Sequence, residues 1–168
     1  LYLYVEYLFM VKLATPSKTL TSGQRVEHVI KQCRKLPWKP RGGASDEGRG
    51  SGAGENDDAD ADASRLVAKF VLKVARAKAD AVPLAADCLA GLHQYRPHVT
   101  TLVIDRIMEE LDAAIDAPPA RRPLRTAQRL TAYCALFGEC YNFSLVSSQH
   151  VFACLHRLLR RGHEVTDA

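Results

Sequence analysis

Apolar residues recur every three to four positions along most of this chain, which is the spacing of one face of an α-helix. No segment shows the period-two alternation that is typical of a half-buried strand. Thr21 and Gln24 have the spacing of a helix capping box, and Pro37 is placed to end the helix that follows it. The pattern predicts helices at about 1–14, 22–36, 64–79, 80–95, 97–116, 121–138 and 148–161.

Short links join the later predicted helices, so consecutive helices are expected to pack antiparallel. Stacked pairs of this kind are typical of α-solenoids. We therefore predict an all-α fold, a HEAT-like α-solenoid of antiparallel helical hairpins that forms one module over residues 1–168. This prediction depends on helix pairing alone, because no fixed-period sequence repeat occurs.

Residues 40–63 interrupt the helical pattern with a stretch rich in Gly, Ala, Ser and Asp. Within it, the block 41–63 has seven acids and two arginines, which gives it a net charge of −5. Because the whole chain has a net charge of +4, the residues outside the block carry about +9. The stretch has too little apolar surface to offset the cost of ordering, so we predict a disordered acidic insert. A basic folded part with an acidic insert favours polar partners over a small-molecule pocket.

Candidate catalytic chemistry is sparse. The five cysteines form no CxxC pair, and the six histidines form no HExxH motif. Each cysteine falls on the apolar face of a predicted helix, which favours buried, reduced thiols of a cytosolic or nuclear protein. No Gly-rich phosphate loop is present, and no apolar run is long enough to cross a membrane. We therefore expect no enzymatic activity, no cofactor, no metal site and no membrane contact.

The predicted helix 97–116 has an unusual concentration of carboxylates. At about 100° per residue, four of them fall within about 60° of one another, with Glu110 beside them. These four are Asp105, Glu109, Asp112 and Asp116. Like charges at this spacing disfavour the helix slightly, so the helix itself does not require them. The ridge is either an ordinary solvated face or a docking surface for a basic partner.

A basic stripe follows the predicted helix 64–79, with members at the spacing of one helical face: Arg65, Lys69, Lys73 and Arg76. Further bases cluster in 121–129. Such residues can contact phosphates, although few aromatic residues are interleaved for base stacking. The alternative interpretation is again a solvated face.

The stretch "LFGECYNFSL" (136–145) marks the predicted end of helix 121–138. We expect its residues to be structural rather than catalytic. Gly138 would allow close helix approach, and Glu139 would anchor nearby backbone or an arginine. Tyr141 and Phe143 would fill the junction with the next helix.

Four segments resemble one known family in the order in which they occur. They are "IKQCRKLPWKP" (30–40), "AADCLAGLHQY" (85–95), "VIDRIMEELDAAID" (103–116) and "RTAQRLTAYCALFGECYNFSLVSSQHVF" (125–152). Together they are similar to the regulator of nonsense transcripts two family, also called up-frameshift protein two. The match is to its third middle domain of the initiation-factor-four-gamma type. The "RKLPW" turn is among the specific pieces, and Pro37 and Trp38 within it are expected to be structural.

This resemblance implies a scaffold module of nonsense-mediated mRNA decay. In that family the module binds the RNA-recognition-like domain of the up-frameshift-three protein through acidic residues of the matching helix. The corresponding positions here are Asp105, Glu109 and Asp116, with Glu110 beside them. Basic surfaces of such modules are expected to help contact RNA. The up-frameshift-one helicase would join the decay complex through regions outside this chain. The expected location is the cytoplasm, with the perinuclear region as an alternative.

The resemblance also has departures and alternatives. The acidic insert replaces a short segment of the family, and the match ends near residue 155, so the solenoid is expected to be incomplete at its C-terminal end. One alternative function is a middle-domain scaffold of translation initiation or cap complexes that binds an RNA helicase. Another is a helical module that binds RNA directly.

Overall fold

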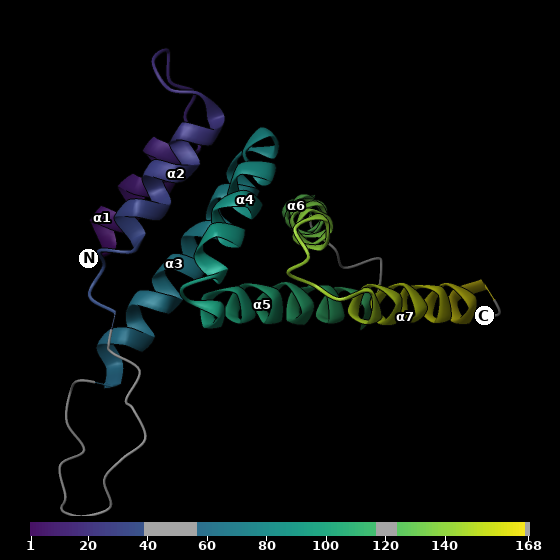
Figure 1. Ribbon diagram of the computed structural model, residues 1–168. Coiled ribbons are helices and arrows are strands. Elements are labelled where there is room, and N and C mark those ends of the chain that lie inside the picture. Colours follow the sequence, from purple (N-terminus) through teal and green to yellow (C-terminus); the bar gives the residue numbers. More distant parts are fainter. Residues whose placement is uncertain (39–56, 117–123, 167–168) are drawn as a thin grey trace, which may run out of the picture.

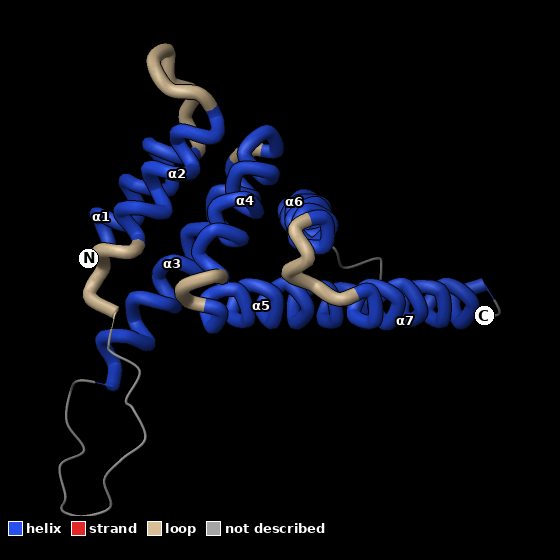
Figure 2. Tube along the Cα trace, in the orientation of Figure 1, coloured by secondary structure: helices blue, strands red, loops and turns tan. Residues whose placement is uncertain are grey.

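The computed structural model describes residues 1–38, 57–116 and 124–166, with backbone alone for 57–62 and 161–166. Every element in these ranges is helical, and none is a strand (Figure 2). The order is α1 (Tyr2–Glu6), η1 (Tyr7–Leu13), α2 (Ser22–Cys33), α3 (Asp57–Ala77), η2 (Ala79–Ala81), α4 (Val82–His93), α5 (Pro97–Asp116), α6 (Leu124–Asn142) and α7 (Ser148–Thr166).

The helices stack as an α-solenoid (Figure 1). Each of α2, α3 and α4 contacts the helix two positions further along the chain, so α2 lies on α4, α3 on α5 and α4 on α6. Consecutive helices α3 and α4, α4 and α5, and α5 and α6 also touch. Two layers of helices arise from this pattern, which confirms the predicted all-α solenoid.

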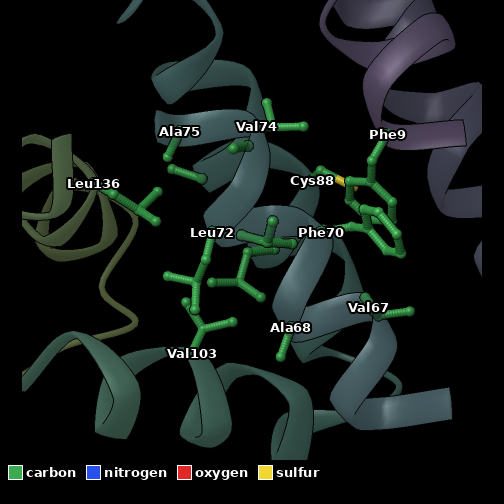
Figure 3. Close-up of a cluster of buried hydrophobic side chains, with 14 of the residues drawn as sticks. Phe9, Val67, Ala68, Phe70, Leu72, Val74, Ala75, Cys88, Val103 and Leu136 are labelled. Atoms are coloured by element: carbon green, nitrogen blue, oxygen red, sulfur yellow. The ribbon is translucent and has the colours of Figure 1, made fainter. Parts of the chain in front are cut away.

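The hydrophobic core is centred on α3 (Figure 3). Phe70 of α3 is fully buried, and Phe9 of η1 and Cys88 of α4 lie on its side of the helix. Val103 of α5 and Leu136 of α6 approach α3 from the other side. Because apolar residues cover most of its circumference, α3 connects the first helices of the solenoid to the later ones.

The N-terminal helix is α-helical up to Glu6 and then widens into a π-helix, η1. Carbonyls at a helix C-terminus lack partners within the helix. Arg25 of α2 acts as a hydrogen-bond donor at this helix end. Its buried guanidinium donates to the carbonyl oxygens of Leu13 at 2.8 Å and Thr15 at 3.0 Å. The predicted capping box of α2 is also present, with Thr21 and Gln24 bonded reciprocally.

Three predicted boundaries are wrong by four residues or more. Helix α7 continues to Thr166, five residues beyond its expected end at 161. Residues 57–63, expected at the end of a disordered insert, belong to α3. Their sequence is acidic and alanine-rich, and alanine favours helix while acids near a helix N-terminus complement its dipole. The remainder of the predicted insert lies outside the described residues. Helix α6 continues to Asn142, four residues beyond the expected end.

Among the described residues, no helix has the length and apolarity that crossing a membrane would require.

Candidate functional site

The acidic ridge is a surface of α5. Its members Asp105, Glu109 and Asp116 are exposed. Within the described part of the chain, no ion pair includes Asp105 or Asp116. These two carboxylates are therefore available to an external cation.

Glu109 has one neighbour of opposite charge. Arg106, one turn earlier on α5, places Nη1 2.9 Å from Glu109 Oε2, and this hydrogen bond is the main reason that the pKa of Arg106 is raised. Both side chains are more than half exposed, at 55% and 65%. Exposed pairs of this kind contribute little free energy, so a partner can displace Arg106 from Glu109 at small cost.

Glu110 and Asp112 are placed differently from the other acids of α5. The side chain of Glu110 is only 14% exposed and pairs with Arg106 at 2.7 Å and with Arg129 of α6 at 2.9 Å. Asp112 pairs with Arg157 of α7. Both carboxylates thus join α5 to its neighbouring helices. The predicted five-residue surface is therefore reduced to Asp105, Glu109 and Asp116.

The basic stripe of α3 faces a groove between α3 and α6. Arg65, Lys69 and Arg76 are exposed, whereas Lys73 is half-buried and donates to Glu6 of α1 at 2.5 Å. This hydrogen bond to Glu6 is the largest cause of the raised pKa of Lys73. Lys69 also lies over the Tyr2 ring, at 5.2 Å from its centroid. One stripe member is thus used internally, and three remain on the surface.

Two adjoining clefts form this groove. One, of about 350 Å³, also borders α5. It brings Arg65, Lys69 and Arg76 together with Arg106 and Arg129, and with the carboxylate of Glu110 that pairs with these last two arginines. The other, of about 430 Å³, is lined by Arg76 and Arg129 again, and also by Lys73 and Arg125. Four bases of these clefts form no ion pair with a described residue: Arg65, Lys69, Arg76 and Arg125. Arg129 pairs with Glu110. We call these five residues the basic groove.

The turn after α2 is held by its tryptophan. Trp38 donates from Nε1 to the Cys33 carbonyl oxygen at 2.7 Å and packs against the core. Pro37 precedes it and is exposed. The two residues terminate α2 without any group that resembles a catalytic site.

The end of α6 differs from expectation in three respects. Gly138 lies within the helix, and a Cβ added there would meet nothing within 4 Å, so close helix approach is not its role. Tyr141 and Phe143 are 46% and 39% exposed, so neither fills the junction with α7. Glu139 accepts a hydrogen bond from Asn142 Nδ2 at 3.3 Å, rather than from backbone or an arginine.

The cysteines have the environment of structural residues, with one exception. Burial raises the pKa of Cys33 and of Cys140 to about 12, and that of Cys88 well above its usual value. These thiols stay protonated at neutral pH and are poor nucleophiles. Cys134 is exposed, which corrects the prediction that all five thiols are buried. Among the described residues, no three metal-ligating side chains lie close enough to hold an ion.

Sequence reasoning missed the arginines that neutralise part of the ridge. The spacing of Arg106 to Glu109 and Glu110, three and four residues, was a readable signal. Arg129 and Arg157 had no such signal, because they come from other helices and meet α5 only in the fold.

Two comparisons with known proteins agree with this architecture. The MIF4G domain model matches residues 17–167. The "Regulator of nonsense transcripts UPF2" of Arabidopsis thaliana is 23% identical over 142 residues, which cover 84% of this chain and 10% of that protein. The chain thus spans about a tenth of the length of this relative. Because the family model covers most of the sequence, the chain belongs to the MIF4G domain family, in a form similar to that of UPF2.

Proposed function

We propose that this chain is a non-enzymatic scaffold module of nonsense-mediated mRNA decay. In this proposal it binds the RNA-recognition-like domain of an up-frameshift-three protein through Asp105, Glu109 and Asp116 of α5. The observation that carries the proposal is the exposure of these three carboxylates along one helix, while Glu110 and Asp112 are engaged by arginines of the same chain. The similarity to a UPF2 regulator supports the assignment to this pathway.

The physical basis of binding is charge complementarity. Exposed carboxylates spaced by one to two turns can accept Arg or Lys forks from a basic partner surface. Such pairs contribute orientation and association rate, and the close ones contribute affinity as well. The larger decay complex, including the up-frameshift-one helicase, would assemble in the cytoplasm through other regions of the full-length protein.

The first test reverses two ridge charges. Glu109→Arg with Asp116→Arg should weaken binding of the up-frameshift-three domain by about 100-fold, because two charge pairs become repulsive. Titration calorimetry measures the affinity, and circular dichroism checks that helicity is unchanged.

The matched control is Glu27→Arg with Asp80→Arg, which makes the same change in net charge at exposed positions far along the chain from α5. It should bind as the wild type does. A second control, Glu110→Gln with Asp112→Asn, should lower stability with little effect on affinity. Equal affinity of the ridge variant and the wild type would contradict the proposal.

A second candidate function, direct RNA binding, is favoured by the basic groove. The bases of α3 face Arg125 and Arg129 of α6 across two adjoining clefts, so cations from both helices line one path. Phosphate contacts along such a path need no base recognition.

This second function predicts a salt-dependent affinity for single-stranded RNA. Replacing Arg65, Lys69 and Arg76 by Gln should weaken binding of oligouridylate and reduce the slope of log K against log salt by about 2, at ~0.7 per contact. Fluorescence anisotropy at several salt concentrations gives the slope. Replacing Lys12, Lys18 and Lys31 by Gln removes the same charge elsewhere and should leave the slope unchanged. A slope that both triple variants change equally would exclude the groove as the site.

A further inference from the structure

A third polar surface lies at the C-terminal ends of α2 and α4, apart from both surfaces described above. The two helices lie side by side and run in the same direction, so their C-terminal ends lie on the same side of the solenoid (Figure 1). A cleft of about 230 Å³ opens there. Its lining comes from the residues just after each helix and from one buried leucine: Arg34, Trp38, Leu92, Tyr95 and Arg96.

The two arginines of this cleft are held by reciprocal stacking. Arg34, after α2, lies 4.0 Å from the ring centroid of Tyr95, which follows α4. Arg96, beside Tyr95, lies 5.3 Å from the ring of Trp38, which follows α2. Each guanidinium therefore lies over an aromatic ring from the opposite helix end. A cation–π contact of this kind restricts the side chain and leaves N–H groups of the guanidinium to donate.

No carboxylate of the described residues neutralises these cations, since no ion pair includes Arg34 or Arg96. Two carbonyl oxygens at these helix ends already accept hydrogen bonds from other groups. The Leu92 oxygen accepts from the backbone N–H groups of Tyr95 and Arg96, and the Cys33 oxygen accepts from Trp38 Nε1. Two oriented cations thus face a cleft whose floor, Leu92, is apolar and 1% exposed.

We propose that this cleft binds a phosphorylated side chain of a protein partner. A phosphate monoester carries about −1.5 to −2 charge at neutral pH, which matches two unpaired guanidiniums. Arginine forks recognise its oxygens by bidentate hydrogen bonds. A nucleobase fits less well, because the arginines already cover the aromatic faces on which a base would stack. The small volume suits one side chain and its adjoining backbone rather than a folded domain.

Trp38 makes the test direct, because it is the only tryptophan in the sequence and lines the cleft. The full chain is titrated with the acetylated peptide Ala-Ala-phosphoserine-Ala-Ala while Trp38 fluorescence is recorded. We expect a saturable change with the phosphopeptide and none with the same peptide carrying unmodified serine. Arg34→Gln with Arg96→Gln should weaken phosphopeptide binding at least about tenfold.

The matched control, Lys12→Gln with Lys18→Gln, removes two cations that line neither the cleft nor the basic groove and should bind the phosphopeptide as the wild type does. Circular dichroism establishes that each variant is folded. If the double variant of the cleft is not folded, the single change at the exposed Arg34 replaces it, with the same direction of effect expected.

Four outcomes would overturn the proposal. The first three are the absence of a saturable change, an equal response to the unmodified peptide, and an affinity that survives the loss of both arginines. A tighter, Arg34-dependent response to oligouridylate than to the phosphopeptide would assign the cleft to nucleic acid and would equally overturn it. None of these outcomes bears on the acidic ridge, which shares no residue with the cleft.

Discussion

At the scale of single residues, the same side-chain type has different roles on α5 according to its neighbours. Glu109 and Glu110 are adjacent in sequence, yet their side chains are 65% and 14% exposed. Glu110 points toward Arg129, so its charge is used within the fold. Glu109 faces solvent with only a weak partner on its own helix. Exposure and pairing, rather than residue type, therefore select the carboxylates that a partner can reach.

The buried thiols lead to a prediction for alkaline pH. The pKa values of Cys33 and Cys140 are raised from 9.0 to about 12 in the native state. Above pH 9.0 the unfolded chain releases these protons while the native chain retains them, so the free energy of unfolding should fall as pH rises toward 12. Each thiol contributes up to about 1.4 kcal/mol per pH unit in that window.

Urea unfolding at about pH 8 and about pH 10.5 measures this loss. The control is Cys33→Ala with Cys140→Ala, which lowers stability at both pH values but removes the contribution of these two thiols to the slope, so that Cys88 remains as a buried thiol with a raised pKa. Identical slopes for the variant and the wild type would show that the two thiols are not the cause.

At the scale of elements, two glycines illustrate how packing overrides helix propensity. Gly138 lies in α6 with open space around it, whereas Gly91 lies in α4 against α2. A Cβ at position 91 would stand 2.3 Å from Ile30 Cδ1 and 3.2 Å from Ile30 Cγ1. A side chain at position 91 would therefore have to displace the Ile30 side chain, whereas one at Gly138, to which the sequence pattern assigned close helix approach, would meet nothing.

We predict opposite effects of alanine at these positions. Gly138→Ala should raise the free energy of unfolding by about 0.5–1 kcal/mol, because alanine favours helix and meets no obstacle. Gly91→Ala gains the same propensity but must displace Ile30, so it should lower stability by about 1 kcal/mol or more. Chemical denaturation of both variants gives the comparison, and a stabilising Gly91→Ala would show that α2 and α4 yield more easily than their contact implies.

At the scale of the whole molecule, the last helix, α7, is less buried than the helices in the middle of the solenoid. The helices α3 to α6 contact several neighbours each, whereas α7 makes its main contact with α5 alone. Several apolar side chains on α7 are exposed as a result: Phe152, Leu155, Leu158 and Leu159. Residues of the same type should therefore contribute very different amounts to stability at the two places.

Leucine truncations test this inequality. Leu136→Ala, at a position with 0% exposure, should cost about 2–5 kcal/mol because it leaves a cavity between α6 and α3. Leu159→Ala, at 65% exposure, should change stability by less than about 0.5 kcal/mol. Urea unfolding measures both. A comparable loss in the two variants would mean that the outer face of α7 is covered in solution.

The sequence alone determined the helices, the solenoid class and the line of acids on α5. Periodicity reports which face of a helix is apolar, and a capping box or proline reports where a helix begins or ends. These signals involve residues close together in the sequence, so they can be recognised without knowledge of the fold. They failed at residues 57–63, where a composition typical of disorder extends a helix that the core of α3 already stabilises.

Only the tertiary structure decided which charges remain available. Arg129 and Arg157 reach α5 from other helices, and Arg34 meets Tyr95 across the ends of α2 and α4. Such pairs depend on how the helices cross and on which residues then face one another. The periodicity of one helix carries no information about its position relative to another helix. The tertiary structure therefore reduced the ridge to three carboxylates, joined two basic segments into one groove, and created the arginine cleft, because each depends on contacts between distant parts of the chain.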